Sequence, residues 1–412
     1  MQKFTYRAKN NTGETLIGEI ESTSENSAAR VLITKKLFPI EIKNITARTE
    51  NPLEKIPFLS FLDGISKKKK AVAMRQLSAL INAGLSLTQS LLTMSKESGN
   101  QKLKNVFNDV LRDVEGGTSL AQAFSSHPRA FSPLDISLIN AGERSGTLDK
   151  VLKRLANQLE KEAELISKLR GAMIYPAFVL IAVVGVIALM LLYVVPKLTE
   201  LYQDFKGNIP AVTQFLINLS NFSKSYWWAI ILIIVVTAAG FKSFINTEIG
   251  RKYWDFFKIK APIFNVLIVK IYLARFTRTL GTLIGAGVPV LDSLRITSDS
   301  VGNVVYKQAL LDATEKVKSG TALSTPLADS SLFPATVSQM IKVGEQTGDI
   351  DGMLDSLANY YEDEVDNLTK GLATLIEPLI VVFLGFIVAF IVIAVMSPIY
   401  SLSKTIFDAP RM

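Results

Sequence analysis

Two stretches of this chain repeat one another, and they determine how the rest of the sequence is interpreted. Residues Arg75–Leu91 read RQLSALINAGLSLTQSL, and residues Arg278–Leu294 read RTLGTLIGAGVPVLDSL, with 8 of 17 positions identical. Further along, Ala141–Glu162 matches Val343–Glu364 at 10 of 22 positions. Self-similarity at a nearly constant offset is the signature of a repeated structural unit. The sequence therefore predicts one domain of about a hundred residues that is used twice.

Each copy leads into a long apolar segment. Ile174–Val195 follows the first copy and Pro378–Ser403 follows the second, and neither contains a charged residue. Both exceed the roughly 20 residues that a helix needs to cross about 30 Å of hydrocarbon. Between the copies, Tyr226–Phe241 is shorter and is bounded by Lys224 and Lys242. A buried core helix is the alternative for this segment, but the lysines at both ends and the aromatic start favour a third span.

Lysine and arginine are distributed unevenly around these three segments. They are dense before the first span and after the second, and they are sparse in the connector between those spans and in the C-terminal tail. Because positive residues gather on the cytoplasmic side of a membrane, we expect the N-terminus and the region after the second span to be cytoplasmic. The connector and the C-terminus are then external, and both copies enter the membrane in the same direction.

The soluble part of each copy is predicted to be helical. In Leu103–Val114, for example, apolar residues recur every three or four positions. Ahead of the copies, Phe4–Glu21 alternates around Asn10–Gly13, which predicts a hairpin, while Ser27–Leu37 and Pro39–Ile45 predict a helix and a strand.

The predicted fold is mainly α: an integral membrane protein with three transmembrane helices, two duplicated cytoplasmic helical bundles and a small N-terminal α+β module. The expected segments are the N-terminal module at 1–46, a linker at 47–67, the first helical domain at 68–172, the first span at 173–196, an external connector at 197–224, the second span at 225–242, a cytoplasmic connector at 243–270, the second helical domain at 271–374, the third span at 375–401 and an external tail at 402–412.

The composition excludes several classes of function. The 412 residues include no cysteine and one histidine, His127, which excludes thiol catalysis and any site built from several histidines or cysteines. The net charge of +8 is modest for this length and does not indicate nucleic-acid binding. Gly281–Gly287 is rich in glycine but lies within a helical pattern, which favours close helix packing over phosphate binding. We expect no enzymatic activity, no cofactor and no metal.

Two charged clusters have plain structural interpretations. The acidic residues Glu362–Glu364 are consecutive on a predicted helix and do not face one another, which favours a solvated helix face. The basic run Lys67–Lys70 could contact anionic lipid or an acidic partner. A solvated end of the linker is the alternative for this run.

A turn with the pattern Gly-Glu-x-x-Gly-x-x-Asp occurs once in each copy. Glycine permits a tight turn between helices, and aspartate suits the first turn of the following helix. The alternative is a surface that contacts a partner, with acidic groups at an exposed bend, or an adventitious cation site. The candidate partner-contact residues are Gly142, Glu143, Gly146 and Asp149 in the first copy, and Gly344, Glu345, Gly348 and Asp351 in the second.

The entrances of the first and third spans contain four intramembrane candidates. Tyr175 and Pro176 in the first copy align with Glu377 and Pro378 in the second. A carboxylate within a membrane is costly, which makes Glu377 a candidate functional group. A hydrated position near the cytoplasmic interface is the alternative for Glu377.

Taken together, these features resemble the type II secretion F / PilC family. The resemblance rests on the opening Phe4–Ser22 (FTYRAKNNTGETLIGEIES), on the doubled helical domain with its repeated turn, on the Tyr-Pro and Glu-Pro span entrances and on the three-span layout. It covers nearly the whole chain. Members of this family are inner-membrane platform proteins of type II secretion systems and type IV pilus machines.

The resemblance implies a protein that has no catalytic activity and couples a cytoplasmic hexameric ATPase to the assembly of pilin or pseudopilin subunits. It also implies a bacterial inner-membrane location, other inner-membrane assembly proteins as partners, and a homo-oligomer in the lipid bilayer. The alternative is a subunit of an oligomeric transporter or channel, although three spans cannot enclose a pore alone. A membrane receptor or signalling adaptor is a third class, but the sequence has no recognisable output domain.

Overall fold

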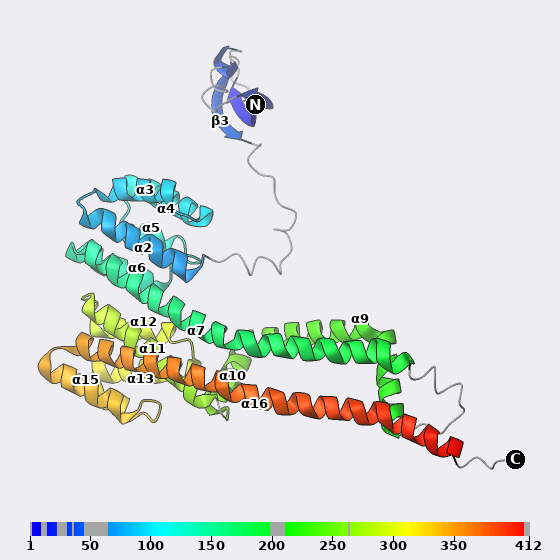
Figure 1. Ribbon diagram of the computed structural model, residues 1–412. Helices are drawn as coiled ribbons and strands as arrows, with labels where there is room; N and C mark the ends of the chain where they lie inside the picture. Colours follow the sequence, from blue (N-terminus) through cyan, green and yellow to red (C-terminus); the bar gives the residue numbers. More distant parts are fainter. Residues whose placement is uncertain are drawn as a thin grey trace. The chain divides into compact units, whose positions relative to one another are not determined.

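The computed structural model describes residues 2–9, 15–22, 31–34, 37–44, 65–197, 211–262 and 264–407 (Figure 1). The chain divides into two units, Met1–Gly64 and Ile65–Met412. Among the described residues, the second unit contains the repeated domains and the three long apolar helices.

The N-terminal unit contains a three-stranded antiparallel sheet. Its strands are β1 (Gln2–Lys9), β2 (Thr15–Ser22) and β3 (Phe38–Asn44), in the order β2-β1-β3. β1 and β2 pair from Gln2↔Ser22 to Lys9↔Thr15, on either side of the predicted turn, whose residues lie outside the described part of the chain. Residues 31–34 are helical. The rest of the helix expected over residues 27–37 is mostly outside the described residues, so the α+β module stays a prediction.

The second unit contains two helical domains with the same order of elements. The first domain consists of α2 (Lys67–Asn82), α3 (Leu87–Glu97), α4 (Gln101–Glu115), α5 (Leu120–Ser125), α6 (Pro133–Ser145) and the start of α7 (Leu148–Leu189). The second consists of α11 (Asn265–Gly285), α12 (Val290–Ser300), α13 (Val304–Lys318), α14 (Ser324–Ala328), α15 (Ala335–Thr347) and the start of α16 (Ile350–Phe407). The predicted duplication of a helical domain is confirmed.

Equivalent residues begin and end equivalent helices. Asn100 and Asn303 begin α4 and α13, and each side-chain oxygen accepts two backbone N–H groups of the first turn. Such caps satisfy donors that the helix itself cannot pair. Gly84 and Gly287 follow the ends of α2 and α11 with φ of 88° and 82°, a conformation that glycine adopts without strain.

Each domain has its own apolar core, and the two cores meet. In the first domain, Phe124 lies between two other phenylalanine rings, at centroid distances of 4.4 and 6.1 Å. In the second, Phe333 packs against Phe276 and against a buried tyrosine at 5.1 and 5.7 Å. Leu283 and Val288 of the second domain are buried within the core of the first domain. The two domains therefore share apolar packing as well as polar contacts.

Three helices among the described residues are long and apolar enough to cross a membrane: Leu148–Lys197, Thr213–Asn246 and Ile350–Phe390. Little or none of their most apolar windows is buried within the protein. Because exposed apolar surface of this extent is unfavourable in water, lipid is the solvent that suits these helices. This confirms a membrane protein with three apolar helices.

The helices extend beyond the predicted spans. The first apolar stretch of α7 passes into the π-helix η3 (Met190–Val194). α9 runs over Ala211–Asn246 and contains a kink at Tyr226, so residues 211–224 of the expected external connector are helical. α10 (Glu248–Lys260) occupies much of the expected cytoplasmic connector. Which of these residues lie in the bilayer stays a prediction.

Helix α10 connects the second apolar helix to the second domain. The ring of Trp254 packs edge-on against Phe241 of α9 at 5.2 Å. On its other side, the buried carboxylate of Asp255 accepts the backbone N–H of Val304 at 2.9 Å, at the first residue of α13. Negative charge is favourable at a helix N-terminus. The second domain is therefore attached to apolar helices at both of its ends, through α10 and through α16.

Candidate functional site

The repeated turn joins two helices that approach closely. An added Cβ at Gly142 would lie 2.9 Å from the Cβ of Val151, and one at Gly344 would lie 2.8 Å from the Cα of Ile350. Both helices before the turn then end at a glycine with positive φ, 71° at Gly146 and 77° at Gly348. All four glycines are therefore explained by close packing and by the left-handed conformation that ends a helix.

The glutamates of the repeated turn point back into their own domain. The carboxylate of Glu143 accepts the backbone N–H groups of Leu120 and Ala121 at 2.8 and 3.1 Å, at the start of α5. The carboxylate of Glu345 accepts the backbone N–H groups of Leu323 and Ser324, and also the Ser324 hydroxyl. The alternative in which these turns present free acidic groups is corrected, because each carboxylate caps the short helix of its own domain.

The aspartates of the repeated turn differ between the copies. Asp149 lies in the first turn of α7, and its backbone oxygen accepts the Ser78 hydroxyl at 2.8 Å. Asp351 lies in the first turn of α16, and its carboxylate is 3.9 Å from Arg154 in the other domain. Among the described residues, no group of three or more His, Cys, Asp or Glu side chains could hold a metal ion. A role of these turns in partner contact stays a prediction.

A cluster of arginine, asparagine and glutamate is also repeated, and sequence reasoning missed it. In the first domain, Arg75 of α2 donates to Asn157 at 2.7 Å and to Glu160 at 2.6 Å, both on α7. The same three residue types recur in the second domain, where the arginine of α11 binds the asparagine and glutamate of α16. The Arg278 contacts are 2.6 Å to Asn359 and 2.8 and 2.9 Å to Glu362, with a further ion pair to Asp355.

A lysine–glutamate pair lies beside each cluster and is repeated too. Lys67 pairs with Glu162 in the first domain, and Lys270 lies 3.1 Å from Glu364 in the second. The expected solvated face at residues 362–364 is therefore wrong for the two glutamates, which bind cations of α11, although Asp363 between them is exposed.

The basic run Lys67–Lys70 forms the first turn of α2, and two of its lysines are used internally. Besides the Lys67 pair, the ammonium group of Lys70 is buried and lies 2.6 Å from Asp135 and 2.9 Å from the backbone oxygen of Ala130. A buried ammonium needs such partners, because an isolated charge is costly away from water. The expected solvated run is therefore wrong for Lys70, whereas Lys67 is ion-paired but partly exposed and Lys68 and Lys69 are exposed.

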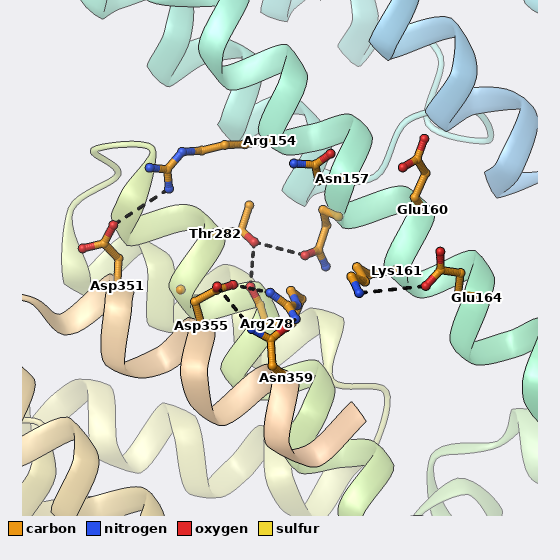
Figure 2. Close-up of a pocket in the computed structure, with 12 residues that line it drawn as sticks. Arg154, Asn157, Glu160, Lys161, Glu164, Arg278, Thr282, Asp351, Asp355 and Asn359 are labelled. Atoms are coloured by element: carbon orange, nitrogen blue, oxygen red, sulfur yellow. Dashed lines mark hydrogen bonds and ion pairs between the residues drawn. The ribbon is translucent and has the colours of Figure 1, made fainter. Parts of the chain in front are cut away.

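The second cluster lies at a polar cleft between the two domains (Figure 2). The cleft has a volume of about 600 Å³, and α7, α11 and α16 line it. Across it, Gln158 of α7 accepts the hydroxyl of Thr282 at 3.1 Å. Three ion pairs also cross between the domains: Arg154–Asp351 at 3.9 Å, Lys161–Glu362 at 3.8 Å and Lys168–Asp366 at 3.5 Å.

Domain docking makes the two arginine clusters physically different. The side chain of Arg75 is 50% exposed, whereas that of Arg278 is 12% exposed. Burial alone would lower the pKa of Arg278, but the hydrogen bonds and charges of Glu362 and Asp355 outweigh it and raise the pKa. Arg278 is therefore a permanent cation that holds α11 and α16 together beneath the first domain.

The glycine-rich segment of α11 takes part in the same packing. An added Cβ at Gly281 would lie 3.0 Å from the Cβ of Leu354 on α16. One at Gly285 would collide with the guanidinium of Arg154 and the carboxylate of Asp351. The geometry agrees with the predicted role in close helix packing.

The four candidates at the span entrances are not part of this cleft. Pro176 lies within α7 and is buried, while Tyr175 beside it is exposed. Glu377 and Pro378 are exposed on α16. Their proposed role within the membrane stays a prediction.

Comparisons with known proteins agree with the duplicated architecture. The family model described as "Type II secretion system (T2SS), protein F" matches residues 73–196 and again residues 276–398. The model described as "Type II secretion system protein F, N-terminal domain" matches residues 1–43. The two ranges of the first model correspond to the two helical domains, each with the apolar helix that follows it.

Curated relatives cover nearly the whole chain. The type IV pilus assembly protein PilC of Myxococcus xanthus is 36% identical over 404 residues, which is 98% of this chain and 96% of the relative. PilC of Thermus thermophilus is 36% identical over 407 residues, covering 98% and 99%. The type II secretion system protein F of Aeromonas hydrophila is 31% identical over 386 residues, covering 94% and 99%.

Proposed function

The chain belongs to the family of type II secretion system protein F, and on this basis we propose that it is an inner-membrane platform protein that couples a cytoplasmic assembly ATPase to the assembly of pilin or pseudopilin subunits. The family is a family of structural membrane platform proteins and not a known family of enzymes. In this role the protein transmits movement and makes no chemical bond.

The observation that carries the proposal is the continuity of α7 and α16. Each helix begins within a helical domain and continues without interruption into an apolar segment. The 58 residues of α16 would be about 87 Å long at about 1.5 Å per residue. A partner that moves either domain would therefore move the attached apolar segment, because a packed helix is a rigid connection.

The partners follow from the same role. The sequence lacks a phosphate-binding Gly-Lys motif, so the energy must come from a separate ATPase, which we propose binds the helical domains from the cytoplasm. Pilin or pseudopilin subunits and other inner-membrane assembly proteins would contact the apolar helices. We propose that the chain forms a homo-oligomer with a cytoplasmic N-terminus and an external C-terminus.

Among the two systems, pilus assembly is the better supported. The two relatives named PilC above are both 36% identical to the chain, whereas proteins F of Aeromonas hydrophila and Vibrio cholerae are 31% and 29% identical. A complete deletion that abolishes surface filaments but leaves protein secretion intact would support a pilus platform. Loss of secretion with normal filaments would instead assign the chain to a secretion system.

The coupling is tested by co-isolation. The full-length protein, tagged and extracted in mild detergent, should retain the cognate assembly ATPase, and the ATPase should be lost when the membrane protein is omitted. Ion or solute movement through liposomes that contain the purified protein without ATPase would contradict the platform role.

A further inference from the structure

Helix α10 carries a row of exposed apolar side chains on one of its sides. Ile249, Tyr253, Phe256 and Phe257 follow one another at intervals of four, three and one residues, so they share one side of the helix. All four are exposed, Ile249 by 69% and Tyr253 by 70%. The carboxylate of Asp255, on another side of α10, is buried against the second domain. The apolar face of α10, defined by these four residues, is therefore turned away from the domain that the helix packs against.

Such a row is unusual for the helical domains. Within those domains, large apolar side chains that are exposed occur singly, as at Val72, Leu92 and Val343. Phe264 and Val266, which follow α10 in the chain, are exposed as well. Isolated apolar residues at a surface need no explanation, but a contiguous row indicates a surface that is covered by something other than water.

The apolar face lies where an apolar helix ends. A single residue separates the end of α9 from the start of α10. The ring of Trp254 packs at 5.2 Å against Phe241, the last residue before Lys242 closes the uncharged stretch of α9. On its other side, Trp254 stacks on Phe257 of the apolar face at 5.6 Å. Aromatic residues gather where a membrane meets water. The contacts of Trp254 thus place α10 level with the end of the second apolar helix.

The cations of α10 lie beside the same apolar face. The ammonium group of Lys260 is 4.6 Å from the centroid of the Phe256 ring, and Lys252 is exposed one turn before that ring. Within the described part of the chain, neither lysine has an ion pair, and neither has the exposed Arg251. The exposed acid Glu248 lies in the first turn of the helix, where negative charge is favourable. Aromatic residues beside lysines are typical of helices that lie in the interface of a membrane.

We propose that the apolar face of α10 binds the surface of the cytoplasmic leaflet, with its aromatic rings among the lipid headgroups and its lysines on anionic headgroups. The membrane is the occupant that the structure favours, because α9 leads directly into α10 and Trp254 contacts the end of the apolar stretch. Since Asp255 on α10 binds the start of α13, the lipid contact also fixes the second domain to the bilayer. The proposal goes beyond the platform role and rests on it only for the side of the membrane.

Quenching of a fluorescent label tests this contact in the full-length protein, because the chain contains no cysteine of its own. Tyr253→Cys and, as a second position, Ile249→Cys are labelled in nanodiscs of phosphatidylcholine and phosphatidylglycerol. A nitroxide attached to the lipid near its headgroup should quench both labels strongly, and iodide in the water should quench them weakly. The matched control is Val343→Cys, an exposed apolar position on α15, which lies away from the apolar helices (Figure 1). Its label should be quenched by iodide and not by the lipid.

Neutralising the lysines provides the second measurement. With phosphatidylglycerol present, Lys252→Gln with Lys260→Gln should lower the ratio of lipid to iodide quenching at position 253 by about fivefold per cation removed. In phosphatidylcholine alone, the same change should have little effect. The control double variant is Lys318→Gln with Lys342→Gln, which removes two exposed lysines of α13 and α15 and should leave the ratio unchanged.

Three results would overturn the proposal. Iodide quenching at positions 249 and 253 equal to that at position 343 would show that the apolar face lies in water. Labels shielded from both quenchers would show that another protein chain covers the face. Lipid quenching that the lysine changes leave unaltered in phosphatidylglycerol would remove the contact with anionic headgroups.

The outcomes are separable from those for the platform role. Lipid quenching of a chain whose deletion has no effect on filaments or secretion would retain the membrane contact of α10 and remove the platform role. Absence of lipid quenching in a labelled chain that still restores filaments to deleted cells would remove the contact and leave the platform role intact.

Discussion

Replacing Arg278 with methionine should destabilise the second domain far more than the same change at Arg75 destabilises the first. The two arginines occupy equivalent positions and bind equivalent asparagine and glutamate partners. They differ in their surroundings, because the first domain covers Arg278 while Arg75 remains half-exposed. Comparing the two variants therefore measures how much stability the docking of the domains adds to an interaction that is otherwise repeated.

The loss of stability that we expect depends on which carboxylates each substitution leaves without the arginine, and on how exposed they are. Glu362 is 17% exposed, and its hydrogen bonds from the Arg278 guanidinium are of the charged kind, worth about 1.5–3 kcal/mol each in net stability. Lys161 remains as a partial partner of Glu362, and Asp355 is 62% exposed and contributes little. We expect a loss of about 2–3 kcal/mol at Arg278. An exposed pair such as Arg75–Glu160 is worth about 0.2–1 kcal/mol.

Hydrogen exchange of the full-length protein in detergent measures this difference locally. The Arg278→Met change should raise amide exchange in α11 and the first turns of α16 by about 30- to 150-fold, since about 1.4 kcal/mol corresponds to a factor of ten. Arg75→Met should raise exchange in α2 and α7 by about fivefold or less. Equal effects at the two positions would refute the conclusion that docking strengthens the second cluster.

Three further predictions concern the repeated turn and the membrane topology. Glu143→Ala removes the acceptor of two backbone N–H groups and should destabilise the first domain by about 1–2 kcal/mol in chemical denaturation, whereas unchanged stability would show that the cap is unimportant. Gly142→Ala forces a Cβ against Val151 and should cost about 1–3 kcal/mol. The matched control Gly171→Ala, which meets nothing within 4 Å, should be neutral or stabilising, and equal costs for the two alanines would contradict the close-packing explanation. Reporter fusions should read inside, outside, inside and outside after Phe61, Gly207, Lys260 and Met412. A cytoplasmic C-terminus would contradict the three-span topology.

The duplication and the apolar helices could be predicted from the sequence because both are patterns along the chain. Residues that recur at a nearly constant offset reveal the repeated domain, and a long apolar stretch without charged residues reveals a transmembrane span. The role of the repeated glycines could also be predicted, because few other residues fit a tight turn or a helix end in the left-handed conformation. Gly146 and Gly348 have the positive φ that such a position requires.

The arginine clusters could not be predicted from local pattern, because their members are separated by more than 80 residues. The signal that could have found them was the repeat itself. Arg75, Asn157 and Glu160 each have an identical counterpart in the second copy, although the neighbours Gln158 and Lys161 do not. The identity at these three positions marks contacts made inside each domain, whereas Gln158 and Lys161 differ from their counterparts and contact the second domain.

The difference in burial between equivalent residues of the two copies depends on how the domains dock, and no local sequence pattern indicates it. Nothing in the local sequence distinguishes the burial of Arg278 from the exposure of Arg75. The orientation of Glu143 could not be predicted for the same reason, because the backbone groups that it binds lie 22 and 23 residues earlier in the chain. A carboxylate at a bend is typical of a surface group, but the carboxylate of Glu143 accepts two N–H groups at the start of α5.

Complementation of a complete deletion is the most direct test of whether this chain is the membrane platform on which a filament is assembled. Surface filaments and secreted proteins are measured in cells that lack the chain, and again after the full-length protein is restored. We expect filament assembly, or secretion if the chain serves that system, to be lost on deletion and regained on restoration. Normal filaments and normal secretion in the deleted cells would show that the chain is not a platform for either system.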